Sequence, residues 1–520
     1  MGRVRVVVWV GVLAGVLAGV LVWASTADDG RQVWPVAAAS TVGMDGQALA
    51  AVLDAIAASE VGVRRVVVVR QGKMVVSASA PPYTAADVVD VRSVTKSVVG
   101  LVVGIAVQEG AVRLDDRVLD VLGAEGVQFV NAEKRLLTVG DLLTMQAGMV
   151  TPDRVADLRE YEQALGGLVR SADWTQTALD RPMAGLPGTV WRYDDGATQI
   201  LVAVLEATTG EPVYAYAQRM LFGPLGIESA VWQVDGVGTT SGPVGLFLSA
   251  EDMARLGEVV RTGGLWRGQR VVDGGWIAAM TTAQVDASAT DGFEGGGYGY
   301  LWWVGEGVIA AAGYGGQRIY VVREDELVVV FTGAVDRLSV GRLEGWLEEI
   351  RAAVGVGDAE GDAALAGAVM RLETSKSAPP SPMPPQAAAI LDVPFVLGAN
   401  PLRWEEITVR AGPDANTLVL LIKYGGAGVV GRLVGMDGVA RVAMAEEERA
   451  RLKVWPAGLV PRVGVRGEWV NGEAVLLLQY GVVESPEVWW VAVDFREVMV
   501  GEGVVVQMYE RTQGVGVVVR

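Results

Sequence analysis

Hydrophobic positions along the 520-residue chain follow four different patterns, and the first is an unbroken apolar run over residues 6–24. Arg3 and Arg5 precede this run, and two aspartates follow it. About twenty apolar residues behind a basic flank predict a membrane-spanning anchor or a signal segment over residues 1–25. We favour an uncleaved anchor, because the run is long for a signal peptide. The two arginines then predict that the rest of the chain lies on the extracytoplasmic side.

The second pattern covers residues 26–370 and alternates between helix and strand. The stretch "RRVVVVRQGKMVVSAS" predicts a β-hairpin that turns at residues 70–73, and "LTVGDLLTMQAGM" predicts a helix start capped by Thr138 and Asp141. Strands are predicted for "YGYLWWV", "GVIAAAGYGGQRIYVV" and "DELVVVFTGAV", and a closing amphipathic helix for "RLSVGRLEGWLEEIRAAV". Together these elements predict one mixed α/β (α+β) domain, in which helices flank an antiparallel sheet.

The last two patterns are a linker and a β-rich region. Residues 371–388 contain "SKSAPPSPMPPQAAA", whose prolines favour an extended, semi-rigid linker. Residues 389–520 carry short Val/Leu-rich runs separated by Gly-Gly, Asp-Gly and Asn-Gly pairs, which are typical of hairpins. We therefore expect a separate C-terminal all-β domain, either a sandwich or a small barrel.

Composition excludes several classes of function. A formal net charge of -18 argues against a nucleic-acid partner, because phosphate binding needs clustered Lys and Arg. The chain has no cysteine, so disulfides and thiol catalysis are excluded. It also has no histidine, which removes the Ser-His-Asp triad and the most frequent metal ligand. We predict neither a metal site nor a cofactor, and any hydrolase built from this chain must take its base from another residue type.

Ser93 and Lys96 are the strongest candidates for chemistry. They lie three residues apart at the start of the apolar helical pattern "SVTKSVVGLVVGIAVQEG", so the hydroxyl and the amine share one helix face. Burial would lower the pKa of the lysine, and a neutral amine could then remove the serine proton. The helix N-terminus would favour the developing negative charge. A chance Ser-x-x-Lys match is the alternative, since the spacing alone is a short and degenerate signal.

The surrounding stretches give that spacing a context. In order, "DVRSVTKSVVG", "LTVGDLLTMQAGM", "PGTVWRYDDGATQILVAVLEATTG", "LFGPLGI", "LSAEDMARLG" and "YGYLWW" together resemble the class C β-lactamase and penicillin-binding-protein-like serine hydrolases. The resemblance covers roughly residues 45–350, and "YGYLWW…GYGGQ" is most similar to the aminohexanoate-oligomer hydrolases of that superfamily. It implies the β-lactamase-like fold and an acyl-enzyme mechanism without a cofactor.

The resemblance also implies a role for each motif residue. Ser93 matches the acylated nucleophile, Lys96 its partner base, and Tyr193 the tyrosine that passes the proton to the leaving group. The family's Tyr-x-Asn motif has Asp195 here in place of the asparagine. A carboxylate near Lys96 would hold the lysine charged more strongly, so we expect Asp195 to modulate the rate. Trp302 and Trp303 are expected in the core or in the cleft wall.

The family's third motif matches "AAGYGGQ", with Gly313 as the motif glycine. The resemblance implies that the backbone N–H of Tyr314 joins that of Ser93 in an oxyanion hole, with Gln317 as the alternative donor. No cation occupies this motif, unlike family members that bind a substrate carboxylate there. Arg318 could supply a positive charge if the strand register shifted by a small amount.

These observations lead to a membrane-anchored, extracytoplasmic serine hydrolase that acts on a small-molecule or short-peptide ester or amide. The alternative is a catalytically silent penicillin-binding-protein-like protein that binds peptide or cell-wall fragments in the same cleft. A third interpretation is an anchored scaffold whose function lies in the β domain.

Overall fold

The computed structural model of the chain describes residues 34–151, 167–288, 296–374, 383–424, 428–437, 439–445, 456, 459, 461–470, 475–495, 505–510 and 515–519. The predicted anchor over residues 1–25 lies outside these ranges, as do residues 375–382 of the predicted linker. No helix within the described ranges combines the length and the apolar character needed to cross a bilayer. From Trp34 onward, the described residues belong to one compact unit.

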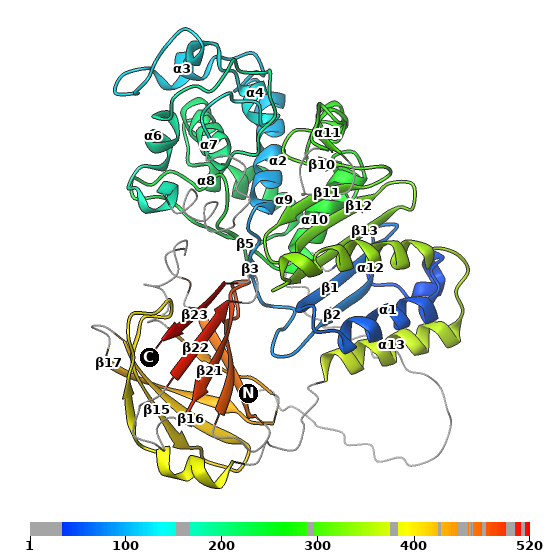
Figure 1. Ribbon diagram of the computed structural model, residues 1–520. Helices are drawn as coiled ribbons and strands as arrows, with labels where there is room; N and C mark the ends of the chain where they lie inside the picture. Colours follow the sequence, from blue (N-terminus) through cyan, green and yellow to red (C-terminus); the bar gives the residue numbers. More distant parts are fainter. Residues whose placement is uncertain are drawn as a thin grey trace, which may run out of the picture. The chain divides into compact units, whose positions relative to one another are not determined.

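An antiparallel sheet of eight strands organises the first half of this unit (Figure 1), in the order β2-β1-β13-β12-β11-β10-β9-β8. Two of its inner strands, β12 and β13, are buried along their whole length because helices cover both faces. The strand bounds are β1 Val63–Arg70, β2 Lys73–Ser79, β8 Val285–Asp286, β9 Gly297–Tyr298, β10 Trp303–Val304, β11 Ile309–Gly313, β12 Gln317–Val322 and β13 Leu327–Gly333.

The predicted hairpin at the start of the sheet is confirmed. Arg70 pairs with Lys73, and the two turn residues between them, Gln71 and Gly72, have φ values of 52° and 74°. Two successive residues with positive φ are the signature of a tight hairpin turn whose twist matches that of the strands. The hairpin therefore forms where the sequence places it, on the β2 edge of the sheet.

The stretch "YGYLWWV", for which strand structure is predicted, does not form one continuous strand. Leu301 has a φ of 62°, and the segment folds back on itself as the two-residue strands β9 and β10. Trp303 is thereby paired with Tyr298 across the turn. An alternating apolar pattern could not reveal this reversal, because the turn contains neither proline nor an Asn-Gly pair.

Helices cover both faces of the sheet. On one face, Phe331 of β13 contacts Trp346 of α12 (Gly341–Ala352), with ring centroids 6.5 Å apart. On the other face, Gly257 of α10 (Ala250–Arg261) lies so close to Val328 that an added Cβ would be 2.6 Å from its side chain. Adjacent side chains of a strand point to opposite faces, which explains both contacts. The helix α12 confirms the predicted closing helix, and α1 (Gly46–Ala58) and α13 (Ala359–Glu373) pack together beside it.

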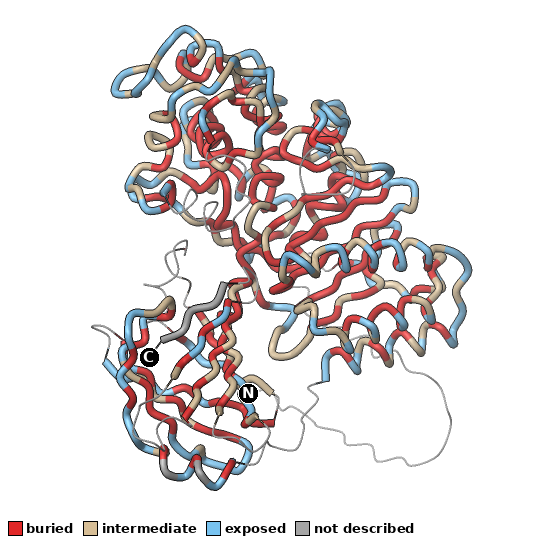
Figure 2. Tube along the Cα trace, in the orientation of Figure 1, coloured by how far each residue is buried: buried red, intermediate tan, exposed pale blue. Residues whose placement is uncertain are grey.

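A mostly helical region lies between β2 and β8 in the chain. The capping box predicted for "LTVGDLLTMQAGM" is confirmed: Thr138 and Asp141 cap α4, each side chain accepting a hydrogen bond from the other residue's backbone N–H. Figure 2 shows the central helix of this region, α2, as buried. The helix bounds are α2 Val94–Gln108, α3 Val118–Leu122, α4 Val139–Leu143, α6 Trp174–Leu179, α7 Asp195–Thr209, α8 Val213–Ala217, α9 Gly223–Leu225 and α11 Gly274–Met280. Short strands accompany them: β3 Val89–Asp90, β4 Val231–Trp232, β5 Leu246–Leu248, β6 Leu265–Trp266 and β7 Gln269–Arg270.

The C-terminal region is a second, all-β domain, as predicted. Among the described residues of this domain, ten strands form one sheet rather than two, so a half-barrel replaces the sandwich considered from the sequence. Its core is mostly aliphatic and contains some aromatic pairs, for example Trp404 against Tyr480 at 5.2 Å between ring centroids. The strands are β14 Pro394–Val396, β15 Trp404–Ala411, β16 Thr417–Tyr424, β17 Gly428–Gly435, β18 Arg441–Met444, β19 Arg462–Trp469, β20 Val475–Val482, β21 Val488–Asp494, β22 Val505–Glu510 and β23 Val515–Val519. The domain boundaries at 370 and 388 remain predictions; α13 runs on to Glu373.

Candidate active site

Ser93 occupies the N-cap position of α2, where the chain leaves the short strand β3 and enters the helix. The residue before it, Arg92, has a φ of 53°, a conformation that non-glycine residues adopt only when their surroundings impose it. Behind Ser93 the helix is buried, and its glycines permit close contacts. A Cβ on Gly104 would lie 2.2 Å from the ring of Trp276. The apolar pattern of α2 thus serves to bury the helix and hold its N-terminus in place.

Lys96 lies one turn into α2 with 1% of its surface exposed, and its ammonium group contacts two hydrogen-bond acceptors and one carboxylate. Its Nζ atom lies 3.0 Å from Ser93 Oγ, 2.9 Å from the carbonyl oxygen of Pro243 and 2.6 Å from a carboxylate oxygen of Asp195. An ammonium has three N–H donors, so each donor has a partner. This explains how a charged lysine is tolerated inside so apolar a helix.

The expectation that burial makes Lys96 neutral is wrong. Burial does act to lower the pKa of Lys96, but the carboxylate of Asp195 and the phenol of Tyr193 together outweigh it, so the pKa lies above the ordinary lysine value. The lysine is therefore an ammonium at neutral pH in the resting protein. Sequence reasoning placed Asp195 near Lys96 correctly, but it could not weigh the ion pair against desolvation without a distance.

The two consecutive aspartates of "RYDDG" have different functions. Asp194 is the N-cap of α7, accepts a hydrogen bond from the N–H of Gly196, and is held by two hydrogen bonds from Arg181. Asp195 is the first residue of the same helix, and its side chain is directed to Lys96. A carboxylate at a helix N-terminus is favoured by the helix dipole. Helix α7 thus presents Asp195 to α2 in a defined orientation.

Tyr193 lies beside Lys96 in a cluster of aromatic side chains. The lysine Nζ is 4.9 Å from the centre of the Tyr193 ring, and that ring stacks on Trp303 at 6.1 Å between centroids. Trp191 and Tyr298 complete the cluster, with Tyr298 at 4.9 Å from Trp303. Burial and the neighbouring Tyr193 and Asp195 raise the pKa of Tyr298 well above its ordinary value. We name these four residues the aromatic wall.

Sequence reasoning found only part of this wall. Trp303 was expected in the core or cleft wall and is 9% exposed, whereas Trp302 is fully buried and donates a hydrogen bond to the carbonyl of Ser97. Trp191 and Tyr298 were not singled out. Both residues belong to the aromatic-rich stretches "TVWRYDD" and "YGYLWW". The β9–β10 turn, which brings Tyr298 next to Trp303, cannot be predicted from those stretches alone.

The third motif lies against the start of α2. A Cβ on Gly313, the last residue of β11, would be 2.3 Å from the carbonyl oxygen of Val91 and 3.3 Å from the Cβ of Arg92. Only glycine allows the strand and the β3–α2 junction to approach this closely. Tyr314 follows directly, so the predicted oxyanion pair, the N–H groups of Ser93 and Tyr314, belongs to two segments in contact.

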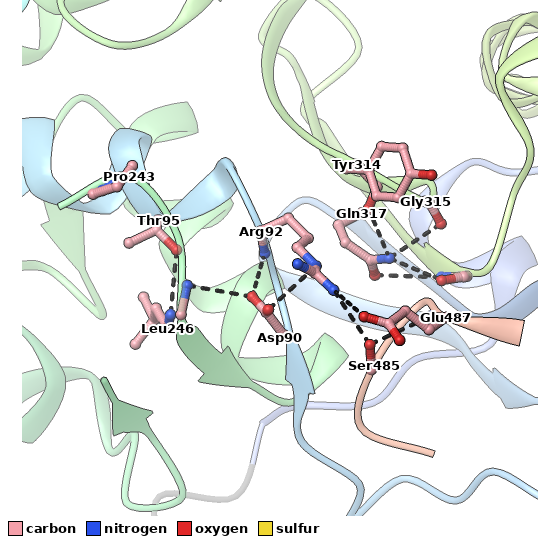
Figure 3. Close-up of polar contacts among 12 residues, drawn as sticks. Asp90, Arg92, Thr95, Pro243, Leu246, Tyr314, Gly315, Gln317, Ser485 and Glu487 are labelled. Atoms are coloured by element: carbon pink, nitrogen blue, oxygen red, sulfur yellow. Dashed lines mark hydrogen bonds and ion pairs between the residues drawn. The ribbon is translucent and has the colours of Figure 1, made fainter. Parts of the chain in front are cut away.

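The side chains of Gln317 and Arg318 are turned away from the reaction centre. The amide of Gln317 donates to the carbonyl of Gly333 and accepts from its N–H, which supports the turn after Gly313 from behind (Figure 3). Arg318 is 6% exposed and donates to the carbonyl of Gly313 at 2.7 Å. The possibility that Arg318 supplies a positive charge to the cleft is therefore not realised in the structure.

Known proteins are similar to this chain in sequence and in fold. The 6-aminohexanoate-dimer hydrolase of Paenarthrobacter ureafaciens is 24% identical over 250 residues, which are 46% of this chain and 64% of that enzyme. The match thus spans less than two thirds of the curated relative. A solved Bacillus anthracis structure, assigned as a 6-aminohexanoate-dimer hydrolase, matches with a TM-score of 0.51 and 17% identity, covering 62% of this chain and 88% of the other. At that identity the likeness shows the fold alone.

A protein-family model provides the wider assignment. The model described as Beta-lactamase matches residues 49–340, more than half of the chain. The matched range contains Ser93, Lys96, Tyr193 and Gly313, together with the whole helical region. The resemblance drawn from the motifs is thereby confirmed, and this chain belongs to the Beta-lactamase family.

Proposed function

We propose that this chain is a serine hydrolase that cleaves small ester or amide substrates through an acyl-enzyme on Ser93. One observation carries the proposal: the Lys96 amine lies 3.0 Å from Ser93 Oγ at the N-terminus of a buried helix. A hydroxyl and an amine in hydrogen-bond contact are the pair that nucleophilic acyl transfer requires. The relatives named above are hydrolases, which supports the same class.

The reaction follows from the positions of these groups. Ser93 Oγ forms a bond to the substrate carbonyl carbon while its proton passes to the neutral amine of Lys96. The N–H groups of Ser93 and Tyr314 stabilise the oxyanion. As the carbonyl–leaving-group bond breaks, Tyr193 delivers its proton to the departing alcohol or amine and takes up the proton that Lys96 accepted from Ser93, which returns the lysine to its neutral form. Water then hydrolyses the acyl-enzyme to a carboxylic acid and restores the serine.

The ion pair between Lys96 and Asp195 controls the fraction of active molecules. Because the pKa of Lys96 is raised, the neutral amine is a minor form at neutral pH. Hydrolysis should therefore accelerate as the pH rises toward the lysine pKa. The same ion pair favours the second candidate function, a silent relative that binds acyl compounds without turning them over.

Covalent labelling by a fluorophosphonate probe separates the two functions, since only an activated serine reacts. The parent protein should be labelled, and Ser93→Ala should abolish labelling. Ser97→Ala is the matched control, because Ser97 lies on the same helix but its hydroxyl donates to the buried carbonyl of Leu301. Labelling that persists in Ser93→Ala would rule out the proposed nucleophile.

The location of the enzyme is a proposal that rests on residues 1–25 alone. An apolar run behind two arginines supports an anchored enzyme whose catalytic domain faces the extracytoplasmic side. Expression of the full chain and of a chain that begins at Ser25, followed by membrane fractionation, tests this proposal. Equal partition of both proteins into the soluble fraction would contradict it.

A further inference from the structure

A loop of the C-terminal domain, residues 483–487 between β20 and β21, contacts the segment that precedes Ser93. The N–H of Asp90 donates to the carbonyl of Glu484 at 2.8 Å. Arg64 of β1 is 3% exposed and donates to the carbonyls of Val483 and Ser485 at 3.0 and 2.5 Å. We name residues 483–487 the 483–487 loop. Its backbone is thus hydrogen-bonded to β3, the strand that leads to Ser93.

The side chain of Arg92 is directed to the same loop (Figure 3). Its guanidinium lies 3.3 Å from Ser485 Oγ, 3.9 Å from Glu487 and 3.2 Å from Asp90. Arg92 is also the residue whose positive φ sets the turn into Ser93. A non-glycine residue persists in that conformation only when surrounding contacts impose it. Two of these side-chain contacts come from the C-terminal domain.

The 483–487 loop also contacts the second segment of the predicted oxyanion hole. Pro486 lies against Gly315, where an added Cβ would be 2.4 Å from the proline Cβ. Gly315 follows Tyr314 directly and has a φ of 75°. One loop therefore touches the residue before Ser93 and the residue after Tyr314.

Buried charges fix the loop to both domains. Arg462 of β19 lies 2.5 Å from Glu484 in the loop and 2.7 Å from Asp87, which precedes β3. The side chains of Glu484 and Asp87 are 3% and 5% exposed. Arg462 itself is 31% exposed, but without it two buried carboxylates would lack their cation, which disfavours separation of the loop from Asp87. We name Asp87, Arg462 and Glu484 the inter-domain ion network.

We propose that the 483–487 loop is a positioning element of the active site, which holds the N–H groups of Ser93 and Tyr314 in register. This inference rests on the proposed function and assigns a role in catalysis to the C-terminal domain. The loop touches no reacting atom. It acts through the conformation of Arg92 and through the turn that begins at Tyr314.

The double variant Ser485→Ala/Glu487→Gln, made in the full chain, tests the inference. It removes the two loop contacts of Arg92 without adding volume. We expect kcat for a p-nitrophenyl ester to fall roughly tenfold to a hundredfold, the range associated with misplaced catalytic groups, with little change in KM. Arg410→Gln is the matched control, because it breaks a solvent-exposed pair with Asp392 in the same domain. The control should keep parental kcat.

This experiment distinguishes three outcomes: displacement of the Ser93 and Tyr314 N–H groups, unfolding of the protein, and failure of the proposed function. Each kcat is expressed per serine titrated by the fluorophosphonate, so unfolded molecules do not count. A second variant, Pro486→Ala, probes the contact with Gly315 independently and should also lower kcat. If the parent is not labelled at all, the proposed function fails. If the parent is labelled and both loop variants turn over at the parental kcat, the positioning role alone is overturned.

Discussion

At the scale of single residues, the protonation of Lys96 is the property on which the chemistry depends. Three acceptors surround the ammonium, and one of them is the carboxylate of Asp195 at 2.6 Å. A raised folded-state pKa means that the pair stabilises the protein fully below the ordinary lysine pKa. That stabilisation is lost only as the pH rises through the higher folded value. The arrangement therefore favours the stable ion pair between Lys96 and Asp195 over a large fraction of neutral Lys96 amine.

Replacing Asp195 by asparagine should shift the pH dependence of hydrolysis. The change removes the charge that raises the pKa of Lys96 and leaves the desolvation that lowers it, so the lysine pKa should fall. We expect kcat/KM for a p-nitrophenyl ester to reach its plateau at lower pH in Asp195→Asn than in the parent. Rates measured from neutral to alkaline pH check this. Identical profiles would mean that the amine of Lys96 is not the base.

The charge around Gly313 leads to a prediction about substrates. Ala311 and Ala312 carry no charge, and Arg318 is engaged with the carbonyl of Gly313. A charged hydrogen bond to a substrate carboxylate is worth ~1.5–3 kcal/mol, or about tenfold to a hundredfold in binding. We therefore expect a short neutral p-nitrophenyl ester to have a higher kcat/KM than nitrocefin. A higher kcat/KM for nitrocefin would mean that a cation near Gly313 binds the substrate carboxylate. Loss of that preference in Arg318→Ala would identify Arg318 as this cation.

At the scale of elements, the site depends on how closely β11 packs against the β3–α2 junction. Three segments far apart in the chain meet there: α2 with Ser93 and Lys96, α7 with Asp195, and β11 with Gly313. The aromatic wall joins them through Tyr193 and Trp303. Each segment contributes one or two residues to the site. Small shifts between these elements should therefore lower the rate of hydrolysis more than they lower the stability of the core.

Gly313→Ala should disrupt this junction. A Cβ placed 2.3 Å from the carbonyl oxygen of Val91 forces the strand and the helix start apart, and overpacking of this kind costs about 1–3 kcal/mol. We expect a lower melting temperature and a loss of kcat roughly a hundredfold or greater, as for removal of an oxyanion donor.

Gly345→Ala in α12 serves as the control. A Cβ there meets nothing within 4 Å, and alanine in a helix should stabilise the protein by about 1 kcal/mol. Normal activity in Gly313→Ala would show that the junction tolerates displacement and that Tyr314 does not complete the oxyanion hole.

At the scale of the whole molecule, the C-terminal domain is connected to the catalytic domain by buried polar contacts rather than by the linker alone. Arg64 and Arg462 provide two of these connections, and both reach the 483–487 loop. The two domains should therefore unfold in a coupled manner.

Arg462→Met should destabilise the protein more than its surface counterpart. The change leaves Asp87 and Glu484 buried without their cation, which costs about 3–5 kcal/mol for a fully buried pair and less here, since Arg462 is 31% exposed. Arg410→Met breaks an exposed pair and should cost about 1 kcal/mol or less. Denaturant unfolding measures both.

A triple variant that adds Asp87→Asn and Glu484→Gln to Arg462→Met should recover part of the loss, because no uncompensated charge remains buried. Equal stability of Arg462→Met and Arg410→Met would mean that the inter-domain ion network contributes nothing to the fold.

Local geometry is what the sequence by itself determined. The helical period placed Ser93 and Lys96 on one face of α2, and the turn residues Gln71 and Gly72 closed the first hairpin where expected. The capping box of Thr138 and Asp141 and the strands separated by glycine-containing turns could also be predicted from the sequence. These features depend on backbone dihedral preferences over a few residues, so a linear sequence contains them.

The protonation of Lys96 and the arrangement of the side chains around it were decided only by the tertiary structure. Whether Lys96 is charged depends on a balance between burial and the carboxylate of Asp195, which lies on a different helix and far along the chain. The turn at Leu301, the position of Arg318 and the contact of the 483–487 loop with Arg92 likewise arise from packing between distant segments. Electrostatic and steric energies depend on distances between atoms, and sequence spacing fixes such distances only within one element.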